Sequence, residues 1–162
     1  QLKTTIAETF YGARWIYKLG LALLVKNAEQ MAHVRAQVLD YGAVCEGLLS
    51  DVLFHGIDRG LMQGQKYRYK NLHRMNNPIN WNVQDKLRQL KKQNFFWHIE
   101  VAHDEAIFGQ PLTDKLHKLR LERNSVHLRE RTQRAFIGKS RYYFNVVIET
   151  CDAVRRWKAN NP

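Results

Sequence analysis

Cysteine, proline and glycine are all scarce in this chain of 162 residues. It holds two cysteines, three prolines and nine glycines. So few prolines and glycines exclude a loop-rich or fibrous protein. Cys45 and Cys151 lie in apolar stretches with helical spacing, which predicts two buried free thiols in a reducing compartment. A disulfide between them stays open as the alternative.

Long hydrophobic runs are also missing. The longest, LGLALLV at residues 19–25, is far shorter than the ~20 residues that cross a bilayer as a helix. The run ends at Lys26 and lacks the small-residue pattern of a cleavage site, so a signal peptide is not expected. We therefore expect a cytoplasmic protein with no membrane partner.

Acidic residues are few relative to basic ones. The chain has 26 Lys and Arg against 15 Asp and Glu, which gives a formal net charge of +11. This imbalance favours a polyanionic partner, namely nucleic acid, an anionic membrane surface or an acidic protein. The alternative is a soluble protein that is basic without binding a polyanion.

Helical periodicity is abundant in the chain, while alternating strand patterns are scarce. We expect helices over residues 4–26, 28–56, 82–92, 95–108, 113–131 and 142–158, the third of them capped by Asn80. Loops are expected over 61–80 and 132–139, and Gly109-Gln110-Pro111 should separate two helices. The prediction is an all-α protein, a single compact bundle of about five or six helices in one domain over 1–162.

The same periodicity predicts which side chains face the core of the bundle. In the first helix they are Ile6, Phe10, Ala13, Tyr17 and Leu21; in the second Val34, Val38, Tyr41, Val44, Leu48, Leu49 and Val52; and in the last Phe144, Val147, Ile148, Cys151, Val154 and Trp157.

The helix expected over 113–131 carries the sequence LHKLRLERNSVHLRERT, residues 116–132. At about 100° per residue, a polar row runs along the edge of its apolar side. The row consists of Arg120, Asn124, His127 and Arg131, and Arg123 falls inside the apolar arc. A plain surface helix would keep its arginines opposite its leucines.

An arginine inside the apolar arc needs a carboxylate, because an unpaired buried charge is costly. Glu46, Asp51 and Glu100 lie on other expected helices and are the candidate partners of Arg123. The alternative to a functional row is a structural one, in which Arg123 and Asn124 anchor the helix and His127 is a boundary histidine.

The segment LRLERNSVHL resembles the signature of HEPN domains, small helical bundles with an Arg-Asn pair shortly before a His on a late helix. The segment VLDYGAVCEGLLSDVL resembles the long early helix of this family, with Glu46 as its inward acid, and FFWHIEVAHDEAIF resembles the lead into the motif. The resemblance covers about residues 28–158. It implies a helical domain that targets RNA and dimerises through residues near 116–131.

The resemblance further implies a metal-independent endoribonuclease of a bacterial toxin or phage-defence system, with an antitoxin or defence-complex partner. Its catalytic residues would be Arg120, Arg123, Asn124 and His127. Nucleases of the family carry Arg, then four to six residues, then His. Arg120 with His127 fits, whereas Arg123 has three intervening residues, so which arginine acts stays open. Non-catalytic RNA binding and a dimerisation or scaffold role are the alternatives.

RNA supplies its own nucleophile, the 2′-hydroxyl, so such a site needs no metal or other cofactor. His127 has an ordinary pKa near ~6.5, which suits acid–base work at neutral pH. An arginine offers a planar fork to the phosphate oxygens. The expected products are a 2′,3′-cyclic phosphate and a 5′-hydroxyl. The stretch HIEVAH is not a zinc motif, because His98 and His103 are five residues apart.

Two basic segments are candidate RNA contacts. In the first, cations alternate with tyrosines that can stack on bases; it contains Lys66, Tyr67, Arg68, Tyr69, Lys70 and Arg74. The second lies close to the motif and contains Arg129, Arg131, Arg134, Lys139 and Arg141. The alternative for the first segment is a solvated loop whose tyrosines fold back on the core.

Overall fold

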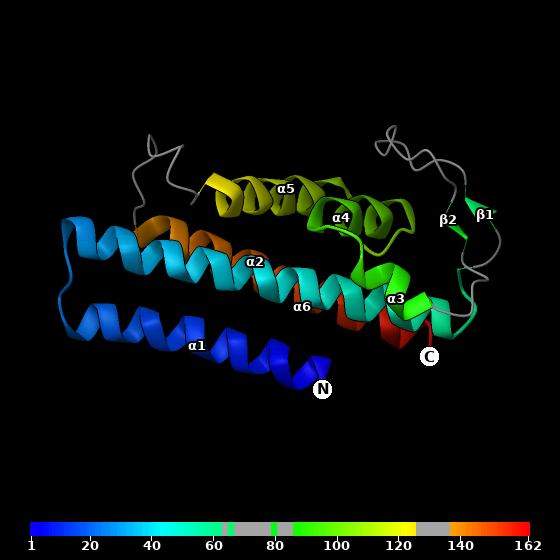
Figure 1. The fold of residues 1–162 in the computed structure, drawn as a ribbon, viewed down its shortest axis with the longest axis horizontal. Helices are drawn as coiled ribbons and strands as arrows, with labels where there is room; N and C mark the ends of the chain where they lie inside the picture. Colours follow the sequence, from blue (N-terminus) through cyan, green and yellow to red (C-terminus); the bar gives the residue numbers. More distant parts are fainter. Residues whose placement is uncertain (63–64, 67–78, 81–85, 126–136) are drawn as a thin grey trace.

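A computed structural model describes residues 1–62, 65–66, 79–80, 86–125 and 137–162 of the chain. Their architecture is all-α, as predicted, apart from one pair of two-residue strands. The helices are α1 (Leu2–Ala22), α2 (Asn27–Asp58), α3 (Lys86–Lys91), α4 (Phe95–Asp104), α5 (Gln110–Ser125) and α6 (Ile137–Asn160). They form a bundle (Figure 1) in which the six helices match the expected number.

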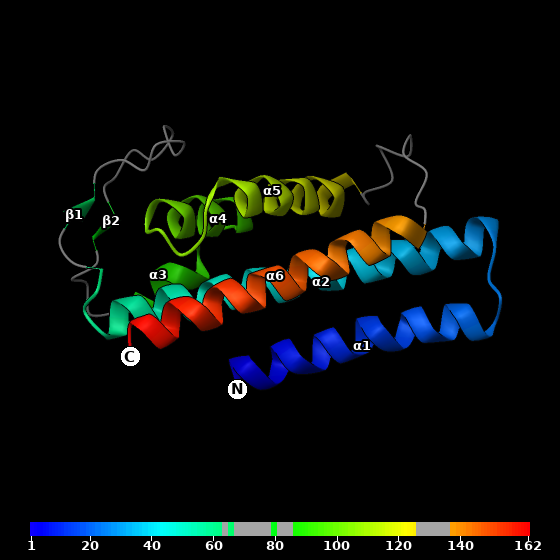
Figure 2. The ribbon, with the colours of Figure 1, turned by 180° about the vertical axis from the view of Figure 1, so that it is seen from behind.

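The long helix α2 is the centre of the bundle. Helix α6 lies along it, α1 covers one side, and α4 and α5 cover the opposite side, as the front and back views show (Figures 1 and 2). The predicted apolar stripe of α2 is buried, with Tyr41, Leu49 and Val52 fully enclosed. The helix stops before Gly60, whose φ of 69° lies in the left-handed region that glycine adopts without strain.

The inward positions were predicted correctly for α2 and in part for α1 and α6. Leu21 and Ile148 are exposed, so both predictions were wrong. Near the end of α1 the buried position is Gly20, which fits against His33 of α2. The buried positions of α6 are Ser140, Tyr143, Val146, Val147, Thr150, Ala153 and Val154. This set places Ile148 on the solvent side of the helix.

Two helix boundaries differ from the sequence-based expectation because of local backbone geometry. Helix α4 ends at Asp104 instead of residue 108, and Ala106 takes a φ of 56° just beyond it. Helix α5 then begins at Gln110, with Pro111 in its first turn, where a missing N–H costs nothing. The expected break therefore lies before Gln110. The far end of the expected helix 113–131 lies outside the described residues.

The expected loop at 132–139 was also incorrect in part. Helix α6 already begins at Ile137, so Lys139 is helical, and its Nζ donates to Glu122 Oε1 at 2.6 Å. The expected start of the third helix, after its cap Asn80, falls among residues 81–85 and lies outside the described residues. The backbone of Asn80 lies in the two-residue strand β2 (Ile79–Asn80), which pairs antiparallel with β1 (Gln65–Lys66) inside the expected loop.

Neither cysteine forms a disulfide. Cys45 is buried and Cys151 is half-buried, and both are free thiols, as expected. Burial raises the pKa of the Cys45 thiol to about 12. A search of the described helices finds none that is both long enough and apolar enough to span a bilayer.

Candidate functional site

The described part of the polar motif lies in the last turns of α5, facing α2 and the start of α4. Arg120, Arg123 and Asn124 line one hollow together with Glu46 of α2. His127, Arg129, Arg131 and Arg134 fall outside the described residues, so their predicted roles stay predictions. The same holds for Tyr67, Arg68, Tyr69, Lys70 and Arg74, and for the side chain of Lys66.

Arg123 points inward and binds Glu46, as the apolar arc of the motif helix predicted. Its Nη1 donates to Glu46 Oε2 at 2.6 Å, and the two side chains are 32% and 26% exposed. The aliphatic part of Arg123 packs on Gly42, where a Cβ atom would approach the Arg123 Cδ to 2.7 Å. Glu46 therefore neutralises this guanidinium, and the absence of a side chain at Gly42 makes room for it.

The other two candidate acids have different partners. Lys158 Nζ donates to Asp51 Oδ2 at 2.5 Å on the α6 side of α2. His117 Nε2 donates to Glu100 Oε1 at 2.5 Å between α5 and α4. Of the three acids proposed from the sequence, only Glu46 forms an ion pair with Arg123.

The hollow beside this ion pair has a volume of about 480 Å³. It is lined by Leu39, Glu46, Asn94, Phe95, Phe96, Arg120, Arg123 and Asn124. Asn94 is fixed there because its side-chain oxygen accepts a hydrogen bond from Trp97 N at 2.9 Å and caps α4. The lining is thus part aromatic and part cationic, with one carboxylate.

Arg120 differs from Arg123 in having no carboxylate partner among the described residues. Its guanidinium carbon lies 5.1 Å from the centre of the Phe96 ring, and its Nε is buried without a hydrogen-bond partner in the described structure. Aromatic stacking holds the planar group without neutralising it. The net positive charge of the hollow therefore resides on Arg120, because Glu46 offsets Arg123.

Sequence reasoning missed the pair formed by His117 and Glu100. The Glu100 side chain is only 3% exposed, and the His117 ring lies 5.4 Å from the ring of Phe96, the same ring on which Arg120 stacks. His117 precedes Arg120 by three residues and so shares its helix face. That spacing was a visible signal, but the acid comes from α4, which periodicity alone could not bring near.

A fully buried histidine lies one turn into α4. His98 is 2% exposed, and its Nε2 is 3.5 Å from Ser50 Oγ. Burial lowers the pKa of His98, while the nearby charge of Glu46 raises it by less. His98 is therefore a neutral core residue in the folded protein and does not line the hollow.

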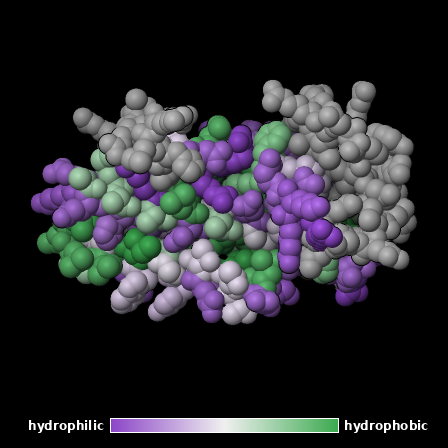
Figure 3. Space-filling view, viewed as in Figure 1, coloured by the Kyte–Doolittle hydropathy of each residue, from purple (hydrophilic) through white to green (hydrophobic). Residues whose placement is uncertain are grey.

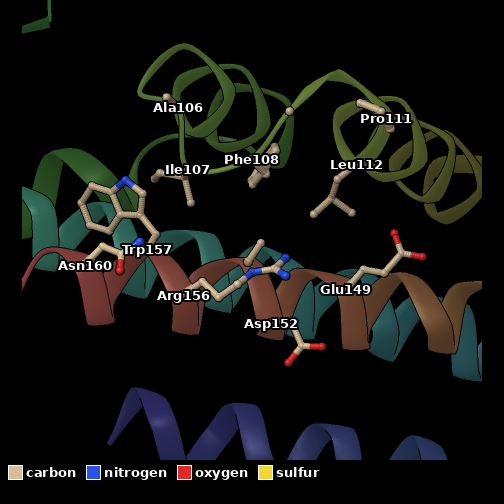
Figure 4. Close-up of a pocket in the computed structure, with 12 residues that line it drawn as sticks. Ala106, Ile107, Phe108, Pro111, Leu112, Glu149, Asp152, Arg156, Trp157 and Asn160 are labelled. Atoms are coloured by element: carbon tan, nitrogen blue, oxygen red, sulfur yellow. The ribbon is translucent and has the colours of Figure 1, made fainter.

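A larger hollow, of about 650 Å³, lies between the α4–α5 connection and α6 (Figure 4). Its two acids already have basic partners. Lys115 Nζ donates to Glu149 at 2.7 Å, and Arg155 Nη2 donates to Asp152 at 3.2 Å. None of the residues predicted for the site lines this hollow. It therefore ranks behind the smaller hollow as a candidate for function.

In the stretches that the structure describes, no group of three or more His, Cys, Asp or Glu side chains is arranged to hold a metal ion. Comparison of the chain with protein-family models, with curated proteins and with solved structures finds no match.

Proposed function

We propose that the chain is an RNA-targeting protein of the HEPN type, a metal-independent endoribonuclease whose hollow beside α5 binds a backbone phosphate. The arrangement of Arg120 and Arg123 carries the proposal. Arg123 is neutralised by Glu46 at 2.6 Å, whereas Arg120 presents its guanidinium to the same hollow with no carboxylate among the described residues. An anion is the ligand that such a hollow favours.

The composition of the lining supports RNA as the source of that anion. The half-buried Phe96 offers a ring surface, and Asn94 and Asn124 offer amides, at the edge of the same cationic hollow, while Phe95 is buried beneath it. Single-stranded RNA is recognised by stacking, base-edge hydrogen bonds and phosphate contacts together. The formal net charge of +11 further favours a polyanion over a neutral metabolite.

The proposed reaction uses His127, which lies outside the described residues. It follows Arg120 by seven residues, a spacing that predicts a shared helix face. Its imidazole takes the proton of the 2′-hydroxyl, and the 2′-oxygen attacks the adjacent phosphorus. The bond from phosphorus to the 5′-oxygen breaks, and that oxygen leaves with a proton from a general acid. Arg120 stabilises the added negative charge on the phosphorane. The products are a 2′,3′-cyclic phosphate and a 5′-hydroxyl.

The proposed biological setting follows from the resemblance of LRLERNSVHL to the HEPN signature. It comprises a homodimer through the motif helix, in which the second copy supplies the acid histidine, an antitoxin or defence-complex partner, and a cytoplasmic location. Such pairing adds a second histidine to a site whose described part has one arginine, Arg120, without a carboxylate partner.

Cleavage of labelled RNA in EDTA tests the proposed function. The wild-type protein should cut RNA without added metal and leave 2′,3′-cyclic phosphate ends, and His127→Ala should abolish cutting while it still binds RNA. Binding without cutting by the wild type would replace the nuclease with an RNA-binding module. If the folded protein neither binds nor cuts RNA, the proposed function is wrong.

A further inference from the structure

Helix α1 turns a row of large apolar side chains toward solvent, on the side away from α2. Tyr11, Trp15 and Leu19 are 71%, 58% and 39% exposed. They are four residues apart, so they fall within about 80° of one another around the helix. Single exposed apolar residues are ordinary, but a contiguous row of them usually marks a contact surface.

Gly12 lies beside this row and is not explained by packing within the chain. A Cβ atom at Gly12 would meet nothing within 4 Å. By contrast, a Cβ atom at each of the other glycines inside α1 and α2 would come within 2.7 to 3.0 Å of a side chain; these are Gly20, Gly42, Gly47 and Gly56. Gly138, near the start of α6, is open in the same way, so the open space at Gly12 does not by itself indicate a partner. Beside the exposed row, however, Gly12 leaves room for the close approach of a second helix.

The charges on the same face are self-complementary. Glu8 and Lys18 are both exposed and lie at opposite ends of the row. In two antiparallel α1 helices related by a two-fold axis near residue 13, Tyr11 lies opposite the partner's Trp15. The same alignment puts Glu8 opposite the partner's Lys18, because both pairs are centred on that residue. Gly12 then lies at the crossing point, where the two backbones approach most closely.

We propose that this face of α1 binds the same face of a second copy of the chain, with the two helices antiparallel. A second copy suits the charges better than other occupants do. An anionic membrane or an acidic protein would repel Glu8, whereas an antiparallel copy pairs Glu8 and Lys18 twice, once on each side of the axis. Figure 3 shows further hydrophobic surface at the end of the molecule where α1 meets α2 in Figure 1.

The pairing is independent of the proposed nuclease site. Helix α1 lies on the opposite side of α2 from α4 and α5, as Figures 1 and 2 show, so the hollow stays open in the paired form. If the motif helix also dimerises, the assembly contains two kinds of two-fold contact and is larger than a dimer. The few side chains in the row cover less area than a standard interface, so we expect association in the micromolar range.

Sedimentation of the full chain from about 1 to about 100 µM brackets that micromolar range and tests the proposal. The mass of the wild type should rise with concentration. Glu8→Lys and Lys18→Glu should each halve the mass of the associated form, because each sets like charges opposite one another. The double variant Glu8→Lys/Lys18→Glu should restore the wild-type mass, since only pairing between copies exchanges the two positions. Trp15→Asp should halve the mass without rescue.

Two controls make the outcome decisive. Glu29→Lys and Lys91→Glu change exposed charges on other helices and should leave the mass unchanged. The proposal is overturned if the mass is insensitive to all α1 variants, or if the double variant behaves as the sum of the single ones. It is also overturned if Trp15→Asp abolishes binding to anionic vesicles while the mass stays constant, because a membrane then covers the face. RNA cutting is a separate readout, so failure here leaves the proposed function untouched.

Discussion

Arg123 of α5 donates from Nη1 to Oε2 of Glu46 in α2 at 2.6 Å. This contact distinguishes Arg123 from Arg120, the other arginine of the hollow. One guanidinium ties the motif helix to the centre of the bundle. The other, three residues earlier, stacks on Phe96 and keeps its charge available to a ligand. The structural role of the motif therefore falls to Arg123, and the proposed function assigns phosphate binding to Arg120.

Removal of the carboxylate in this pair should weaken the fold and strengthen RNA binding. Glu46→Gln should lower the free energy of unfolding by about 1 kcal/mol, since the pair is only partly buried. RNA affinity should rise, because the charge of Arg123 is no longer offset.

Asp51→Asn is the matched control, since it breaks the pair with Lys158 on the other side of α2. That variant should lose similar stability with unchanged RNA affinity. Urea unfolding and RNA titration measure both quantities, and a lower affinity for Glu46→Gln contradicts the assignment.

Gly42 should tolerate no side chain. A Cβ atom there lies 2.7 Å from Arg123 Cδ, so Gly42→Ala must displace the arginine that Glu46 holds. We expect the free energy of unfolding to fall by about 1–2 kcal/mol in urea, as for overpacked sites. Gly138→Ala is the comparison. It is also helical, but its Cβ meets nothing within 4 Å, so it should be neutral or stabilise by up to ~1 kcal/mol. Equal effects of the two substitutions would show that the close approach at Gly42 does not matter.

His98 should make the fold less stable in mild acid. Its pKa is lowered in the folded protein, chiefly by burial. In the unfolded chain the His98 imidazole therefore binds a proton near pH ~6.5, whereas in the folded chain it binds one only at lower pH. Stability from this residue is complete above that pH and is lost as the pH falls below it. The free energy of unfolding should drop between about pH 7 and pH 5 in the wild type and less in His98→Gln. The same slope in both proteins would assign the titration to another group.

The fold was largely readable from the sequence because it depends on periodicity. The row from Val34 to Val52 in α2 follows helical spacing, and that helix organises the rest. The boundaries were harder, because they depend on single residues whose conformation periodicity does not encode. Ala106 adopts a positive φ, and Ile137 starts α6 before Gly138, a residue that reads as a loop signal.

The sequence predicted the arrangement of the candidate site only for the residues that lie on one helix. The inward position of Arg123 followed from the helix geometry of 116–131, and the need for an acid followed from burial. The choice of Glu46 over Asp51 or Glu100 required the packing of α2 against α5. The pair of His117 with Glu100, and the stacking of Arg120 on Phe96, join α4 to α5. Such contacts between helices have no signature in a single sequence.

The salt dependence of RNA binding by Arg120→Ala tests the central claim most directly, that Arg120 holds a phosphate in the hollow. The matched control is Lys118→Ala, which removes one charge from the exposed side of the same helix. We predict that Arg120→Ala weakens binding about tenfold or more at low salt and reduces the slope of log K against log salt by about 0.7, the loss of one phosphate contact on a single strand. Lys118→Ala should have a smaller effect on both the RNA affinity at low salt and the slope. If the two variants bind RNA equally well and with equal slopes, Arg120 is a structural residue and the hollow is not the RNA site.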